Sequence, residues 1–233
     1  MSDAPGPLLA SGRDADVYDL GDGRVLRRYR DHEHDTEFEA RVMHYVRERD
    51  YPVPTVYQVG GTDMIMDRID GVTMLESVRQ ASWKVALHAR TLASLQRRLA
   101  KIRAPQWLLA PTADPDHAES VLHLDLHPMN VMLSKRHGPM VIDWANAAGG
   151  PAGFDAALTY VTISTFPVDS ARDTIGRRAF AEAFRRIRGA KLLDPYVIVA
   201  CDHRLADANL TVDERVGVAA MRKRLKKAST PRA

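Results

Sequence analysis

The chain has almost no cysteine and no long apolar segment. Cys201 is its only cysteine, which excludes an internal disulfide framework and a thiolate zinc cluster. No apolar run approaches the roughly 20 residues that a membrane-spanning helix needs. Residues 1–20 also lack the basic start and apolar stretch of a signal peptide. These absences disfavour transmembrane and secreted proteins, so we expect a cytoplasmic protein with no membrane partner.

Two common phosphate-binding patterns are also missing. No G-x-x-x-x-G-K-[ST] segment occurs, which excludes a P-loop mechanism, and no G-x-G-x-x-G segment opens a helix. The chain has no lysine before Lys84. Apart from histidine, any cationic side chain in the first 83 residues is therefore an arginine.

The composition is that of a soluble globular protein. Of the 233 residues, 45% are apolar and 27% are charged, which suits one ordinary domain or two small lobes. Basic residues concentrate at the end: seven of them and no acidic residue follow Glu214. The basic tail over 222–233 could touch nucleic acid. A solvated helix end is the favoured interpretation, so we do not expect a nucleic-acid partner.

Hydrophobic spacing predicts a change of structural class near residue 70. The first part is predicted to hold strands over 8–30 with a hairpin turn at Gly21–Gly23, a helix over 36–49 and a strand pair over 55–68. The second part is predicted to be mainly helical. Its helices are expected over 72–79, 82–102, 154–165, 170–188, 195–209 and 213–227, with short strands over 131–133 and 140–142.

Three oxygen-bearing side chains stand in loops beside short apolar strands: Asp125, Asn130 and Asp143. A carboxylate among apolar residues is costly unless it has a partner or a task. This set suits magnesium-dependent phosphoryl transfer, in which one carboxylate orients a substrate hydroxyl while an amide and a second carboxylate hold hard cations. The alternatives are turn or capping roles and a metal triad of His123, Asp125 and His127.

Several segments resemble the aminoglycoside phosphotransferase family, relatives of choline kinases and protein kinases. HLDLHPMN at 123–130 and VIDW at 141–144 resemble its catalytic and metal loops. Residues 11–29 resemble its phosphate-covering hairpin and third strand, and residues 64–75 its hinge segment. The resemblance spans about 8–165. It implies an α+β, two-lobed, protein-kinase-like fold, with a nucleotide-binding sheet-and-helix lobe over 1–70 and a helical lobe over 71–233.

The resemblance also implies residue roles. Asp125 would be the catalytic base that orients the acceptor hydroxyl, and Asn130 and Asp143 would be the Mg²⁺ ligands. His123 would brace the catalytic loop by bonding backbone near Asp143, and Asp155 would buttress the same loop.

ATP would be bound mainly by residues of the first lobe. Gly12 would open the loop over the phosphates, where a missing side chain lets backbone N–H groups approach the anion. Three consecutive residues would border the adenine through backbone groups: Met66, Asp67 and Arg68.

The chain departs from the family at the third strand, where the family has a phosphate-binding lysine. Alignment places Arg27 there, with Glu39 of the following helix as its partner. Arg28 is the alternative, because a one-residue slip turns a side chain to the other face of a strand. Asp14 and Asp16 in the hairpin would repel a triphosphate if they pointed inward, so we expect both to face water or to pair with Arg13 or Arg24.

These observations predict an ATP- and Mg²⁺-dependent kinase that phosphorylates a hydroxyl of a small molecule, either aminoglycoside-like or another metabolite. The alternative is a nucleotide-binding pseudokinase or scaffold, which the missing lysine and the acidic hairpin motivate. Acidic side chains of the last helices are candidates for the acceptor pocket: Asp169, Asp173, Asp202, Asp207 and Asp213.

Overall fold

The computed structural model describes residues 5–31, 34–108 and 119–229. The chain divides into two compact units. The first comprises Met1–Thr73 and Met129–Ala147, and the second comprises Met74–Pro128 and Ala148–Ala233. The sequence-based division at residue 70 assigned 129–147 to the helical part, whereas strand pairing groups this segment with the first unit.

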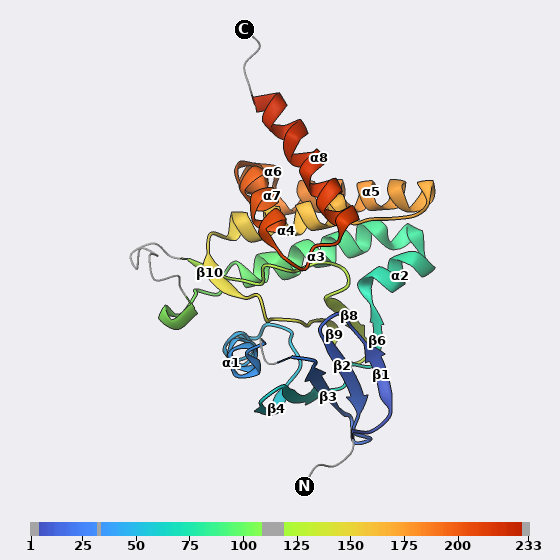
Figure 1. Ribbon diagram of the computed structural model, residues 1–233, viewed down its shortest axis with the longest axis vertical. Coiled ribbons are helices and arrows are strands. Elements are labelled where there is room, and N and C mark those ends of the chain that lie inside the picture. Colours follow the sequence, from blue (N-terminus) through green and yellow to red (C-terminus); the bar gives the residue numbers. More distant parts are fainter. Residues whose placement is uncertain (1–4, 32–33, 109–118, 230–233) are drawn as a thin grey trace. The chain divides into compact units, whose positions relative to one another are not determined.

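An antiparallel five-stranded sheet forms the body of the first unit (Figure 1). Its strand order is β1-β2-β3-β5-β4, and the β2–β3 connection turns at Gly21 and Gly23, whose φ angles of 81° and 83° suit glycine. The hairpin turn predicted from the sequence is therefore present. The strands are β1 (Leu8–Ser11), β2 (Ala15–Asp19), β3 (Arg24–Tyr29), β4 (Val56–Gly60) and β5 (Asp63–Asp67).

Helix α1 (Thr36–Arg47) packs on β4 and β5. Asp35 caps its start by accepting a hydrogen bond from the backbone N–H of Phe38 at 2.8 Å. The helix buries Val42 and Val46 completely. It ends two residues earlier than predicted, and Asp50 follows in a left-handed conformation with φ 58°.

A second, three-stranded sheet in the first unit has the order β6-β8-β9. It consists of β6 (Gly71–Thr73), β8 (Val131–Ser134) and β9 (Gly138–Val141). The N–H of Val141 also donates to the carbonyl of Pro52 at 2.8 Å. The prediction of a helix from residue 72 is wrong at its start, because residues 71–73 pair with β8 and the helix begins only at Met74.

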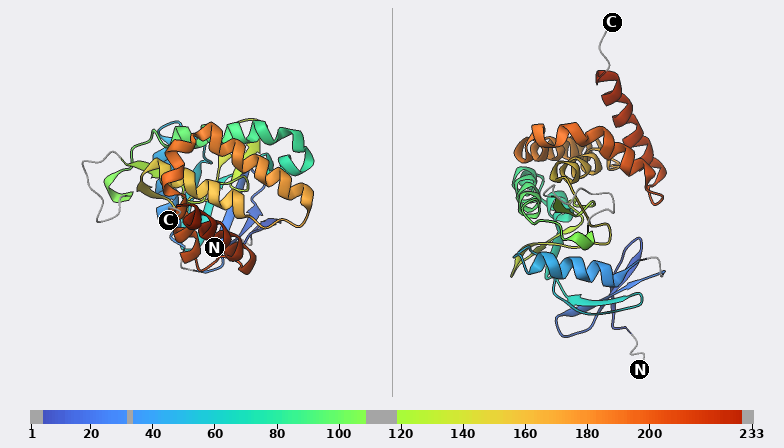
Figure 2. Two further views of the ribbon diagram at one scale, coloured as in Figure 1. Left: turned by 90° about the horizontal axis from the view of Figure 1, so that it is seen from above. Right: turned by 90° about the vertical axis from the view of Figure 1, so that its left-hand side faces the viewer.

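The second unit is mainly helical, and Figure 2 shows α3 (Val85–Leu99), α4 (Ala152–Thr165) and α5 (Ala171–Arg188) side by side. Helix α3 packs along α5, and α4 contacts both α5 and α7. A two-stranded sheet of β7 (Ser120–Leu122) and β10 (Ala148–Gly150) was not predicted. The helices are α2 (Met74–Gln80), α3 (Val85–Leu99), α4 (Ala152–Thr165), α5 (Ala171–Arg188), α6 (Ala190–Leu193), α7 (Val197–Ala206) and α8 (Val212–Ser229), with 3₁₀ turns at Ser82–Lys84, Gln106–Leu108 and Asp194–Tyr196.

The predicted helix over 195–209 is only partly present. Pro195 lies in a 3₁₀ turn, and α7 runs from Val197 to Ala206. Of the predicted basic tail, residues 222–229 form the end of α8 and residues 230–233 lie outside the described residues. In the described part of the chain, no helix has both the length and the apolar character needed to cross a bilayer.

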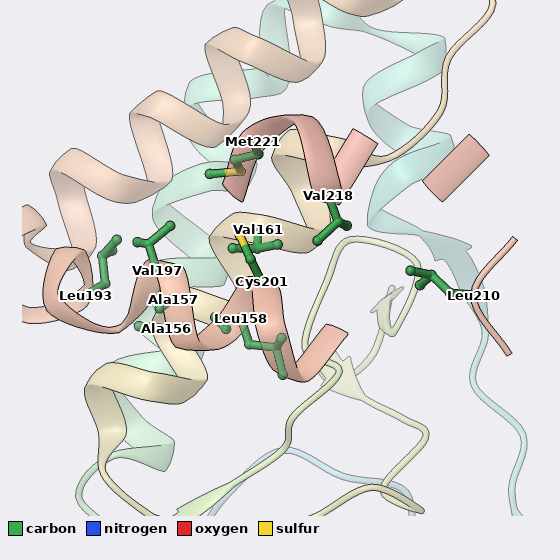
Figure 3. Close-up of a cluster of buried hydrophobic side chains, with 11 residues drawn as sticks. Ala156, Ala157, Leu158, Val161, Leu193, Val197, Cys201, Leu210, Val218 and Met221 are labelled. Atoms are coloured by element: carbon green, nitrogen blue, oxygen red, sulfur yellow. The ribbon is translucent and has the colours of Figure 1, made fainter. Parts of the chain in front are cut away.

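The core of the second unit lies where α4, α7 and α8 meet (Figure 3). Small side chains such as Ala157 and Ala200 let these helices approach closely, and Leu158, Val161 and Val218 fill the space between them. Cys201 belongs to this core and is fully buried. Burial raises the pKa of its thiol to about 11, so it is a packing residue without thiolate chemistry.

Candidate active site

Arg27 forms the centre of a polar cluster in the first unit. It lies in the middle of β3, and its guanidinium donates from Nη1 to Glu39 Oε1 at 2.9 Å and from Nη2 to Asp143 Oδ1 at 2.8 Å. Burial by itself lowers the pKa of Arg27, but the charges of Glu39 and Asp143 more than offset that effect and raise it. The cation is therefore held permanently between two carboxylates.

Glu39 is fully buried and is the anchor of this cluster. Besides Arg27, it accepts hydrogen bonds from the hydroxyl of Tyr29 at 2.6 Å and from the backbone N–H of Trp144 at 2.9 Å. Burial and the Glu39 charge raise the pKa of Tyr29, so the hydroxyl remains a donor. These three donors offset the cost of burying a carboxylate.

Arg28 points to the other side of the same strand. It forms a two-bond pair with Asp63 of β5, both bonds at 2.7 Å, and both side chains are substantially exposed. Of the two arginines that the sequence left open, Arg27 is thus the one that pairs with Glu39.

The loop after β9 carries Asp143 and Trp144. Asp143 has φ 69°, a left-handed conformation that is uncommon for a residue with a side chain and is often found at functional sites. Trp144 is fully buried, packs edge-on against Tyr51 with ring centroids 5.5 Å apart, and donates from Nε1 to the carbonyl of Val141 at 3.2 Å. The buried tryptophan therefore anchors the loop, while 38% of the Asp143 side chain stays exposed.

Asn130 lies next to this loop through the backbone. Its carbonyl accepts a hydrogen bond from the N–H of Ile142 at 3.1 Å, which places the residue before β8 beside the residue before Asp143. An amide oxygen and a carboxylate are hard donors that suit Mg²⁺, which binds through one or two carboxylates and completes its shell with water and substrate phosphates. The described residues contain no group of three or more His, Cys, Asp or Glu that could hold a metal. Asn130 and Asp143 therefore suit Mg²⁺, which needs few protein ligands.

Hydrogen bonds between its own residues hold the hairpin that is expected to cover the phosphates. The N–H of Gly12 donates to the carbonyl of Ala15 at 2.9 Å, and a side chain at position 12 would bring its Cβ to 3.2 Å from that oxygen. Asp16 accepts hydrogen bonds from Ser11 and Arg30. It is paired as expected, but with Arg30 and not with Arg13 or Arg24. The amide of Gly12 itself is used in the turn, so its phosphate contact stays a prediction.

The predicted adenine border lies at the end of β5. Met66 is buried and pairs with Val25 of β3. Asp67 accepts from the backbone N–H of Thr55 at 2.7 Å, and Arg68 donates its backbone N–H to the carbonyl of Gly23 at 2.9 Å. The segment is thus tied into the sheet, and its contact with adenine stays a prediction.

The second unit carries Asp125 in the loop after β7. The loop backbone is fixed from two sides: Asp155 of α4 accepts from the N–H of Leu124 at 2.8 Å, and His123 Nδ1 accepts from the N–H of Asp125 at 3.2 Å. His123 is fully buried. These bonds hold the backbone of the loop in place. The predicted bond from His123 to backbone near Asp143 stays a prediction.

Burial acts on both carboxyl groups of this loop region, but the net shift in pKa has opposite signs. Burial by itself raises the pKa of Asp125, but contact with His127 and nearby positive charge lower it below its ordinary value. In Asp155 burial dominates and raises the pKa to about 6, although Leu124 and His123 donate to it from the backbone. Asp125 is therefore ionised at neutral pH, as a general base must be.

Arg204 of α7 approaches Asp125 and was missed at the sequence level. Its Nη1 lies 4.0 Å from Asp125 Oδ1, and the same oxygen lies 3.4 Å from His127 Nε2. No local motif surrounds Arg204, and only the packing of α7 brings it to the catalytic loop.

Comparison with known proteins identifies the family of the chain. The sequence profile of the phosphotransferase enzyme family matches residues 6–118 and 74–190, which together cover most of the chain. The chain belongs to the phosphotransferase enzyme family. No curated protein matches it in sequence.

Solved kinase structures share its fold. The crystal structure of aminoglycoside phosphotransferase APH(4)-Ia is 15% identical, with a TM-score of 0.69, and the match covers 97% of this chain and 94% of that one. Ethanolamine kinase from Plasmodium vivax is 11% identical, with a TM-score of 0.60, covering 92% and 81%. The streptomycin–ATP complex of APH(2")-IIa is 13% identical, with a TM-score of 0.56, covering 84% and 82%. The predicted α+β, kinase-like fold is confirmed.

Proposed function

We propose that this phosphotransferase uses ATP and Mg²⁺ to phosphorylate a hydroxyl group of a small molecule. The observation that carries the proposal is the Arg27 guanidinium held between Glu39 and Asp143. The family places a lysine at this point, and Arg27 supplies the same charge with a fork that can bind phosphate oxygens. A cation on the strand, a buried glutamate behind it and an aspartate beside it form a phosphate-binding arrangement.

In the proposed reaction, Asp125 orients the acceptor hydroxyl and accepts its proton. The hydroxyl oxygen forms a bond to the γ-phosphorus as the bond to the β–γ bridging oxygen of ATP breaks, which yields a phosphate ester and ADP. Asn130 and Asp143 would hold Mg²⁺, which neutralises charge on the phosphates when bound. Arg27 would bind phosphate oxygens, and positioning would supply most of the rate enhancement.

The acceptor is proposed as a class. Solved relatives of the fold include complexes with hygromycin B and with streptomycin, and an ethanolamine kinase. We therefore propose a small hydroxyl compound, with aminoglycosides and amino alcohols among the first to be tested. The pseudokinase alternative was motivated in part by the missing lysine. Arg27 supplies a positive charge at the same place, so this alternative is less favoured.

The test is ADP release from Mg·ATP across a library of metabolites and antibiotics. In the presence of an active acceptor, Asp125→Ala should lower turnover about 100-fold or more, since a positioned base contributes that much. Asp194→Ala is the matched control, because Asp194 pairs with Arg185 near the surface, and its turnover should equal that of the wild type.

Two results would contradict the proposal. Asp125→Ala could turn over at the wild-type rate, which would reject the assignment of the base. Alternatively, a thermal-shift assay could show Mg·ATP binding without ADP release for any compound, which would favour the pseudokinase.

A further inference from the structure

Arg204 lies among three carboxylates in the second unit. Its guanidinium is 4.0 Å from Asp125 Oδ1, 3.2 Å from Asp207 Oδ2 and 3.4 Å from Glu214 Oε1, and only 15% of its side chain is exposed. Charges this shielded from water interact more strongly than exposed pairs do.

The two outer carboxylates are themselves fixed by the corner between α7 and α8. Glu214 Oε2 accepts from both the N–H and the hydroxyl of Thr211, at 2.9 and 2.8 Å, which closes a capping box at the start of α8. Asp207 accepts from the N–H of Asn209 at 2.9 Å. The guanidinium is thus held in a defined place, with Nη2 toward Glu214 and Nη1 between Asp207 and Asp125.

The catalytic loop needs such a contact. His123 and Asp155 fix its backbone, but backbone bonds do not set the side-chain torsions of Asp125. Arg204 and His127 both approach Oδ1 of its carboxylate. At 3.4 and 4.0 Å these are charge contacts and not hydrogen bonds. Two basic groups on the same side favour the side-chain torsions that turn Oδ1 toward them.

We infer that Arg204 is a positioning residue that orients the Asp125 carboxylate from the α7–α8 corner. The inference rests on the proposed function of Asp125 as the base. Arg204 acts through Asp125, and its loss should lower kcat and leave the KM for ATP unchanged. Small misplacements of a catalytic group cost up to about 100-fold in rate, so we expect a loss of about tenfold or more.

The main experiment measures ADP release from Mg·ATP alone, with water as the acceptor, in four variants. Arg204→Gln should lower kcat, and Arg204→Lys, which keeps the charge, should restore much of it. Arg204→Gln also removes a positive charge that pairs with Asp207 and Glu214, which destabilises the corner. The double variant Arg204→Gln/Glu214→Gln removes that excess charge, and glutamine can still serve in a capping box.

The double variant separates positioning from stability. If Arg204 positions Asp125, the double variant regains thermal stability but keeps the low kcat. If it regains kcat as well, Arg204 only neutralises the corner and the inference is overturned. Arg215→Gln is the matched control: Arg215 binds the carbonyls of Leu205 and Asp207 in the same corner, and its loss should leave kcat unchanged.

A second measurement does not depend on turnover. A double-mutant cycle of Arg204→Gln with Asp125→Asn, followed by urea unfolding, reports the interaction between the two side chains. We expect a coupling of at least about threefold in the unfolding equilibrium constant. Absence of coupling overturns the inference. Coupling combined with wild-type ADP release that does not depend on Asp125 refutes the proposed function, and shows the Arg204–Asp125 contact to be structural only.

Discussion

Arg27 and Asp143 lie 116 positions apart in the sequence and are joined by a hydrogen bond of 2.8 Å. The same guanidinium binds Glu39 at 2.9 Å. Its two terminal nitrogens lie in one plane, so it can serve two carboxylates in different directions at once. A lysine has a single nitrogen and would have to reach both from one point. The arginine therefore ties the β3 strand, α1 and the Asp143 loop into one arrangement.

This arrangement predicts different effects for the two neighbouring arginines of β3. Arg27→Gln should weaken binding of Mg·ATP about tenfold or more, because a charged hydrogen-bond donor near the phosphates is lost. Arg28→Gln should have little effect, because Arg28 pairs with Asp63 on the other side of the strand. Isothermal titration calorimetry with a non-hydrolysable ATP analogue measures both affinities. A larger loss for Arg28→Gln would show that the phosphate lies on the opposite face.

The free energy of unfolding should depend far more on Glu39 than on Asp63, which pairs with Arg28 at an exposed position. Glu39→Gln keeps the shape but replaces one acceptor oxygen with an amide nitrogen, and it leaves the buried Arg27 cation with less compensation. Breaking a buried ion pair costs roughly 3–5 kcal/mol. Asp63→Asn breaks the exposed pair with Arg28 and should cost about 1 kcal/mol or less. Equal losses in urea unfolding would contradict the anchoring role of Glu39.

Several features could be predicted from the sequence because their signals are local. The Gly21–Gly23 turn requires glycine at positive φ, and the helix beginning at Thr36 has a capping aspartate and apolar residues at helical spacing. The pairing of Arg27 with Glu39 followed from the family alignment. In each case the residues involved are close in sequence or lie in a recognisable motif.

Other features depend on contacts that no local pattern encodes. Strand β6 has only three residues and exists because β8, far along the chain, pairs with it. The same holds for β7 and β10. Arg204 is one of many arginines in the helical part, and its approach to Asp125 follows from how α7 packs. Short strands and charge contacts between distant segments are set by tertiary structure, so single-sequence patterns miss them.

Gly71 tests whether the β6–β8 pairing matters for the stability of the protein. A Cβ at this position would lie 2.0 Å from the carbonyl oxygen of Leu133, so Gly71→Ala must separate the two strands. We expect a loss of stability of about 1–3 kcal/mol, as for other overpacked sites. Gly60→Ala is the control, because nothing lies within 4 Å of its Cβ position. A wild-type melting temperature for Gly71→Ala would show that the pairing is dispensable.

The buried carboxyl of Asp155 should make stability depend on pH in the direction opposite to most aspartates. Its pKa in the folded protein is about 6, above the ordinary value of 3.8, so the folded state binds the proton more tightly than the unfolded chain. Its contribution to stability is therefore present below about pH 4 and is lost as the pH rises through 6. The difference of about two pH units corresponds to about 3 kcal/mol.

Asp155→Asn removes this titratable group, so the difference between the wild type and the variant reports the titration of Asp155 alone. Relative to the variant, the wild type should lose up to about 3 kcal/mol of unfolding free energy between pH 4 and pH 7. Urea unfolding at several pH values measures how the difference in unfolding free energy between the two proteins changes with pH. A cost of the substitution that is the same at every pH does not affect this slope. Asp63→Asn is the control with the opposite sign. Arg28 lowers the pKa of Asp63, so the wild type should gain stability relative to that variant as the pH rises to about 5 and show no further change from there to pH 7. If the wild type and Asp155→Asn show the same dependence of stability on pH, Asp155 is ionised in the folded protein well below pH 6. Its charge would then be stabilised by Gln96, whose side-chain amide donates to it at 2.8 Å, and by the N–H of Leu124.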